Sequence, residues 1–200
     1  MLSPAVDLDD QDLPTGELEF IALDGTLTES VAWIGATAAP GVQASATLLP
    51  SGHRRERSAA VPHLPVGPVG DHLIEVCAAA VRARLHTVIG DELGASRLAE
   101  RRALLTVDVL PEPSEWYRAR SVETVLKVRA KEIRRWLRHH DDHPLELASH
   151  GWSGDLDALW RAIGRPTRGP QGRRLDVVRL DEGAVVILSV PPRIDIRPSR

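Results

Sequence analysis

The sequence predicts an α+β protein. N-terminal antiparallel β-hairpins packed with a helix are followed by a three-helix segment and a C-terminal β-hairpin, in a winged-helix-like order. Three observations predict this fold. Alternating apolar residues flank Asp24-Gly25, apolar residues at helical spacing recur between residues 121 and 163, and two alternating runs flank residues 181–183.

Two hairpins are expected in the first quarter of the chain. Residues 17–23 and 26–34 form the first, because Asp24-Gly25 supplies the two turn positions that need positive φ. Residues 42–49 and 54–61 form the second around Pro50, Ser51 and Gly52. The consecutive charges at 54–57 favour an edge strand.

The middle of the chain predicts one long helix, a short helix and a strand. Residues 61–70 contain too many Pro and Gly residues for either element, so they form a connector. Asp71 caps a helix to about residue 89, which Gly90 closes. A short helix covers 96–103, and the alternating residues 104–110 form a strand that ends at Pro111.

The C-terminal part predicts three helices and a hairpin. The first helix covers residues 121–139, the second follows Pro144, and the third ends at Gly164 after a cap at Ser153 or Asp155. Residues 174–180 and 184–190 then form the hairpin. We therefore expect four parts: an acidic flexible arm (1–16), a β-rich α+β half (17–110), a helical half with a C-terminal hairpin (114–190) and a basic tail (191–200). Whether the two halves are separate domains stays open.

Charge is distributed unevenly along the chain. Residues 1–52 contain eight acids and no Lys or Arg, so the remaining residues hold 25 basic against 20 acidic residues, a net charge of +5. The total of −3 excludes a uniformly basic nucleic-acid-binding protein.

Basic residues recur at helical spacing in the segment 121–139. Four of them fall at i, i+4, i+7 and i+11 and form one cationic stripe, which arginines near the last hairpin extend. The predicted partner-binding residues are Lys127, Lys131, Arg134, Arg138, Arg173 and Arg174. An ordinary solvated helix face would explain the same pattern.

The leading hypothesis is a non-catalytic interaction or regulatory protein, a subunit of a bacterial cytoplasmic complex. Its basic helix face would bind an acidic protein partner or a second copy, with nucleic acid as the less favoured ligand. One alternative is an enzyme with a His/Asp site, metal-dependent or not, between the two halves. It would use His139, His143 or His150 with Asp108, Asp141 or Asp142. The other alternative is a winged-helix-like DNA-binding regulator, against which Asp155 and Asp157 on the third helix argue by phosphate repulsion.

Two short segments resemble catalytic motifs but lack an essential residue. Residues 21–28 resemble the first motif of haloacid-dehalogenase-type phosphatases, with Ala22 where the nucleophile is expected. Residues 150–154 lack the final Gly of a serine-hydrolase elbow. Because the sequence also lacks a phosphate loop, a dinucleotide fingerprint and a Cys-based zinc pattern, we expect no cofactor and no metal site, and we assign no catalytic residue.

Cysteine usage and hydropathy suggest the compartment. Cys77 is the only cysteine, which excludes an intramolecular disulfide, and its apolar surroundings predict a buried small residue. The N-terminus lacks a signal peptide, and the longest uncharged segment, residues 30–52, is interrupted by Gly and Pro. We therefore expect a cytoplasmic protein that does not bind membranes.

Overall fold

The computed structural model describes residues 16–58, 60–100, 103–140, 146–164 and 172–192. The chain divides into two compact units, each made of more than one segment. The first unit contains Met1–Pro65, Glu75–Ser96 and Pro113–Arg118. The second contains Val66–Ile74, Arg97–Glu112 and Ala119–Arg200.

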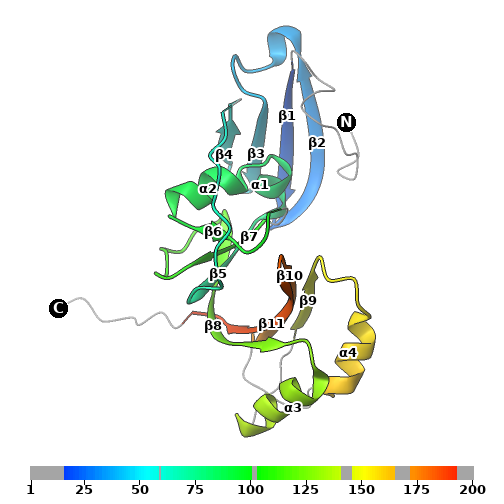
Figure 1. The fold of residues 1–200 in the computed structure, drawn as a ribbon. Coiled ribbons are helices and arrows are strands. Elements are labelled where there is room, and N and C mark those ends of the chain that lie inside the picture. The colour runs from blue at the N-terminus through cyan, green and yellow to red at the C-terminus, as the bar shows by residue number, and fades with distance from the viewer. Residues whose placement is uncertain (1–15, 59, 101–102, 141–145, 165–171, 193–200) are drawn as a thin grey trace, which may run out of the picture. The chain divides into compact units, whose positions relative to one another are not determined.

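A four-stranded sheet forms the first unit's framework (Figure 1). Its order is β2-β1-β3-β4, so β4 is an edge strand as the charges at 54–57 predicted. β1 pairs antiparallel with β2 but parallel with β3, and β3 pairs antiparallel with β4. The strands are β1 (Gly16–Leu23), β2 (Thr26–Ile34), β3 (Ala44–Leu49) and β4 (His53–Arg57).

Both predicted hairpins of this unit are confirmed. Asp24 and Gly25 have φ of 49° and 79°, the left-handed geometry that the Asp-Gly pair predicted. A short 3-10 turn, η2 (Gly35–Thr37), follows β2.

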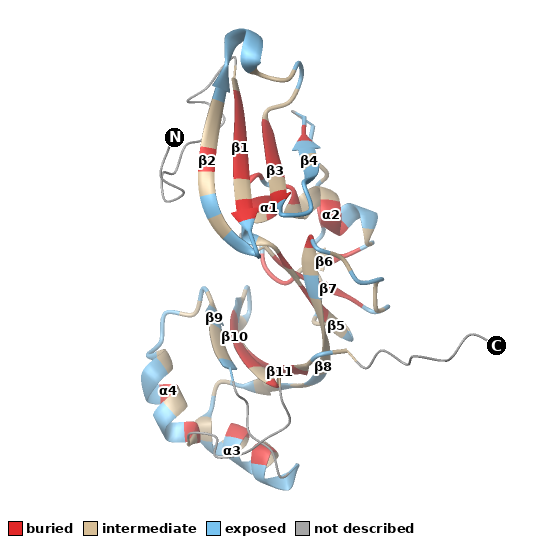
Figure 2. Cartoon of the chain, turned by 180° about the vertical axis from the view of Figure 1, so that it is seen from behind, coloured by how far each residue is buried: buried red, intermediate tan, exposed pale blue. Residues whose placement is uncertain are grey.

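One face of this sheet packs against α1 (Ala78–Arg82). Leu18, Phe20 and Ala22 on β1 are buried on this face, together with Ala44 and Ala46 on β3. Figure 2 shows the same pattern: β1 and β3 are buried along much of their length, whereas β4 is mostly exposed. The small side chains of α1 allow it to lie close to the strands, because Ala79 and Ala80 are fully buried. A second short helix, α2 (His86–Glu92), follows α1.

The second sheet has seven strands in the order β6-β7-β5-β8-β11-β10-β9. β11 pairs antiparallel with both β8 and β10, and β10 pairs parallel with β9. The predicted C-terminal hairpin is confirmed as β10 and β11. The strands are β5 (His72–Val76), β6 (Ser96–Arg97), β7 (Leu104–Val107), β8 (Tyr117–Lys127), β9 (Glu146–His150), β10 (Arg174–Leu180) and β11 (Gly183–Val190).

Two helices pack on one face of the β8–β11–β10 region. They are α3 (Ala130–His139) and α4 (Leu156–Ile163). Their buried residues join strand residues in one apolar cluster: Ile133, Leu137, Leu159, Ile163, Leu175, Val177, Val186 and Leu188. The Asp155 carboxylate caps α4 by accepting from the Ala158 N–H at 2.8 Å, and Gly164 ends the helix, as predicted.

A second apolar cluster contains residues of β5, β7, β10 and β11. Val178 and Ile187 are fully buried in it with Leu73, Leu98 and Leu104. Because Val177 and Val178 belong to different clusters, β10 is covered on both faces.

The predicted fold class is wrong. Only α3 and α4 are helical where three helices were expected, and β8 and β9 replace the first half of the first helix and the second helix. The predicted helix at 71–89 is likewise a strand, β5, followed by two short helices, and the predicted helix at 96–103 begins as strand β6. The described chain is therefore built mainly from two β-sheets and has no winged-helix-like order.

Some predictions fall outside the described residues. These are nearly all of the acidic arm at 1–16, most of the basic tail at 191–200, and Asp141, Asp142 and His143. No helix in the described part of the chain is long and apolar enough to cross a membrane.

The packing around Cys77, the single thiol of the chain, can be tested by alkylation. Burial raises the pKa of the Cys77 thiol above its ordinary value. Alkylation by iodoacetamide should therefore rise with pH along a curve displaced to higher pH in the native protein than in urea, where the same thiol is solvated. A native curve at or below the denatured one would contradict this packing.

Candidate functional site

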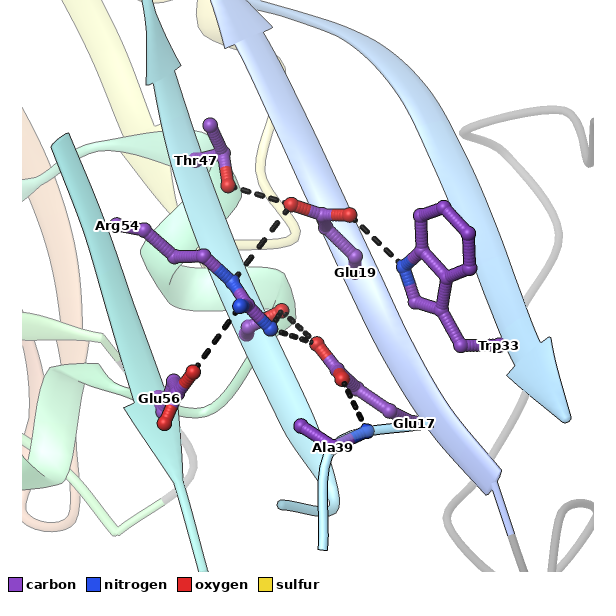
Figure 3. Close-up of polar contacts among 8 residues, drawn as sticks. Glu17, Glu19, Trp33, Ala39, Thr47, Arg54 and Glu56 are labelled. Carbon is purple, nitrogen blue, oxygen red and sulfur yellow. Dashed lines mark hydrogen bonds and ion pairs between the residues drawn. The ribbon is translucent and has the colours of Figure 1, made fainter. Parts of the chain in front are cut away.

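The face of the four-stranded sheet opposite α1 carries a network of polar side chains, which we call the polar sheet face. On β1 and β3, period-two alternation places these residues there, because their neighbours in sequence are the apolar residues that pack on α1. The network comprises Glu17, Glu19, Trp33, Thr47, Arg54 and Glu56, which Figure 3 labels, together with Ser45.

Glu17 is the most deeply buried charged member, with 2% of its side chain exposed. One carboxylate oxygen accepts from the Ser45 hydroxyl at 2.5 Å and from the Arg54 guanidinium. The other accepts from the Ala39 N–H at 3.3 Å. A buried charge needs a partner of opposite sign, and Arg54 supplies it.

Glu19 is held in the same way. It accepts from the Thr47 hydroxyl at 2.5 Å and from the Trp33 indole N–H at 2.8 Å, and Arg54 lies 3.8 Å away. Every carboxylate oxygen of Glu17 and Glu19 therefore has a donor or cation from the strands or from Ala39 in the β2–β3 connection. The polar sheet face holds four strands together, and its acids are already satisfied by the protein itself.

The predicted partner-binding residues do not form one helical stripe. Lys127 ends β8, whereas α3 begins only at Ala130, so Lys127 does not share a helix with Lys131, Arg134 and Arg138. These last three are exposed on α3. Partner binding by these residues stays a prediction.

Arg173 and Arg174 form internal ion pairs instead of facing solvent. Arg173 donates from Nε and a terminal nitrogen to the two Glu123 oxygens, both at 2.6 Å, with 6% of its side chain exposed. Arg174 Nε lies 2.9 Å from Asp176 Oδ1. The sequence did not reveal these acids as partners. Glu123 is 50 residues from Arg173 in the sequence, and Asp176 pairs with Arg174 because strand geometry places both on one face of β10.

His150 also contacts Asp176, at 2.8 Å between Nε2 and Oδ1. A His oriented by a buried carboxylate is the geometry of a general base. Within the described residues, however, no Ser, Thr or Cys side chain hydrogen-bonds His150. Asp176 is nearly fully buried, so Arg174 supplies its counter-charge and His150 a hydrogen-bond partner. Of the expected partners of His150, Asp108 forms no hydrogen bond or ion pair with it, and Asp141 and Asp142 lie outside the described residues.

A pocket of about 550 Å³ lies along α3. Among the predicted residues Arg138 and His139 line it, whereas Lys131 and Arg134 do not. Arg135 and Trp136 were not among the predicted site residues. The described residues that line the pocket are Leu126, Glu132, Arg135, Trp136, Arg138, His139 and His140. Among the described residues, no group of three or more His, Cys, Asp or Glu side chains could hold a metal ion.

The polar sheet face yields a stability prediction. Arg54→Met should lower the free energy of unfolding by about 2 kcal/mol, because two largely buried carboxylates lose their cation. Adding Glu17→Gln should recover part of the loss, since a neutral amide needs no counter-charge. Urea denaturation measures both.

The matched control is Arg118→Met, at an exposed position of the same unit. It should change stability by less than about 0.5 kcal/mol. Equal effects of the two Arg→Met changes would contradict the role given to Arg54.

Comparison with known proteins gives one structural similarity. No family model matches the chain, and no curated protein matches it. The fold is similar to the crystal structure of a protein described as a "putative methyltransferase" from Porphyromonas gingivalis W83, at 15% sequence identity and a TM-score of 0.73. The similarity covers 96% of this chain and 50% of that protein.

This similarity contradicts the hypothesis of a non-catalytic regulatory protein, because the fold is shared with a protein described as an enzyme. It supports neither the winged-helix regulator nor the enzyme with a His/Asp site between two halves. The chain has the fold of about half of the P. gingivalis protein.

Proposed function

We propose that this chain is the acceptor-binding part of a methyl-transfer enzyme. The observation that carries the proposal is the similarity over 96% of the chain to one half of a protein described as a methyltransferase. A fold can serve several chemistries, so the residues must be tested against what methyl transfer requires.

Methyl transfer needs a donor, and the usual biological donor, S-adenosylmethionine, carries an adenosine. Open α/β sheets bind such nucleosides at the carboxyl ends of parallel strands, beside a glycine-rich turn that opens a helix. The described sheets do not fit this requirement. β11 is antiparallel to both of its neighbours, and the sequence has no G-x-G-x-x-G fingerprint.

This mismatch supports a division of roles. In this proposal the donor is bound outside these 200 residues, by another polypeptide or another part of the same one. The chain contributes the surface that holds the acceptor. No step of the transfer is assigned to its residues.

The methyl-transfer proposal is tested in cells of the source organism. Cells with and without the gene are grown on methionine with an isotopically labelled methyl group, and labelled products are compared by mass spectrometry. At least one labelled product should disappear with the gene and return when it is restored. Identical profiles would overturn the proposal.

The division of roles makes a separate prediction. Calorimetric titration of the purified chain with S-adenosylmethionine should give no saturable heat up to about 1 mM, a weak limit on the affinity scale. Micromolar binding would show that the chain holds the donor itself and would overturn the division of roles. The methyl-transfer proposal would still be decided by the cellular experiment.

A further inference from the structure

The pocket along α3 is lined by both aromatic rings and arginines. The proposal that the chain binds a methyl acceptor does not by itself explain this combination. Three ring side chains line it: Trp136, His139 and His140. Two arginines, Arg135 and Arg138, line it as well. Its volume of about 550 Å³ lies within the usual range for small-molecule sites.

The rings form a stacked platform. The Trp136 and His140 ring centroids are 3.9 Å apart with an interplanar angle of 21°, and His139 lies edge-on to His140 at 5.4 Å. His140 Nδ1 lies 2.8 Å from the Trp136 carbonyl oxygen, which fixes the orientation of the imidazole. His140 is exposed, so the stack ends at a ring that another planar group can reach.

The platform rests on a rigid base. Ile133 and Leu137, on the same helix, are fully buried in the apolar cluster. The Arg173 guanidinium lies 5.4 Å from the centroid of the Trp136 ring and is itself held by Glu123. A ligand that stacks here would not have to order the platform first, which reduces the entropic cost of binding.

The charge of the lining favours an anion. Among the described lining residues, Arg135 and Arg138 carry two positive charges against the single negative charge of Glu132. Both arginines are exposed, and neither forms an ion pair within the described part of the chain. Because this end of α3 is the negative end of its dipole, an anion there depends on these two guanidinium groups.

We propose that this pocket binds a nucleotide, with its base stacked on His140, the exposed end of the stack with Trp136, and its phosphate paired with Arg135 and Arg138. Base stacking on rings beside arginines is the usual chemistry of single-stranded nucleic acid sites. An acidic peptide would satisfy the arginines but leave the ring stack unused. The role of this nucleotide as methyl acceptor rests on the proposed function; its binding does not.

The test titrates the purified chain with two probes, adenosine monophosphate and a five-residue oligoadenylate, followed by calorimetry. Arg135→Ala with Arg138→Ala should weaken binding at least about tenfold. The matched control is Lys131→Ala with Arg134→Ala, which removes the same charge from exposed positions of the same helix outside the pocket. It should weaken binding less than about threefold.

Stacking is tested separately at His140. His140→Ala should weaken binding by about fivefold, whereas His140→Phe should retain it, because phenylalanine keeps the ring and loses only the imidazole nitrogens. Circular dichroism confirms that each variant is folded. The altered side chains are exposed, so folding should be unaffected.

If the control double variant weakened binding as much as the Arg135→Ala, Arg138→Ala double variant, general electrostatic attraction would explain the binding. That result would overturn the proposal. No binding of either probe at 1 mM, about the weak limit of useful affinity, would also overturn it. Much tighter binding of the oligonucleotide would identify a strand as the source of the nucleotide, and similar affinities would identify a free nucleotide. Neither probe needs a methyl donor, so nucleotide binding with unchanged cellular methyl profiles would reject only the proposed function.

Discussion

The ion pair between Arg173 and Glu123 determines the arrangement of the second unit around α3. Glu123 is the extra residue of a β-bulge, because Leu188 pairs with Thr124 whereas Ser189 pairs with Val122. The bulge directs Glu123 toward Arg173, at the start of β10. Arg173 in turn lies beside the Trp136 ring, so one bidentate pair links two strands to the helix that carries the pocket.

The bulge also explains why β8 was predicted to be a helix. It places Val122 in one apolar cluster and Leu126 in the other, on opposite faces of the sheet. The period-two alternation that identifies a strand is thereby broken, and the remaining apolar spacing resembles that of a helix continuous with α3. β5 was missed for a different reason. Leu73 and Ile74 are both buried because this strand lies between β7 and β8, and a strand buried on both faces shows no alternation.

Elements defined by local chemistry were predictable from the sequence. Asp24-Gly25 determines a tight turn, Asp155 and Gly164 delimit α4, and polar turn residues separate the two apolar strands of the last hairpin. The candidate site was less predictable, because the basic residues available to a ligand are those without an internal carboxylate partner. Arg173 and Arg174 resembled Arg138 in the sequence, yet their carboxylate partners lie close to them only in the folded sheet. Trp136 similarly met the spacing of a core residue, and only the fold shows that its ring also lines a pocket.

The arginines discussed above fall into two groups, according to whether they pair with a carboxylate of the same chain. Arg54 lies among three carboxylates, Arg173 pairs with Glu123 and Arg174 with the buried Asp176, so these three arginines stabilise strands. Arg135 and Arg138 lie on a helix face whose only lining acid is Glu132. A guanidinium without an internal carboxylate keeps its planar set of donors available to a phosphate. Glu17 and Glu19, from the part of the sequence without basic residues, thus satisfy Arg54 within the four-stranded sheet, whereas α3 carries four basic residues and the single acid Glu132.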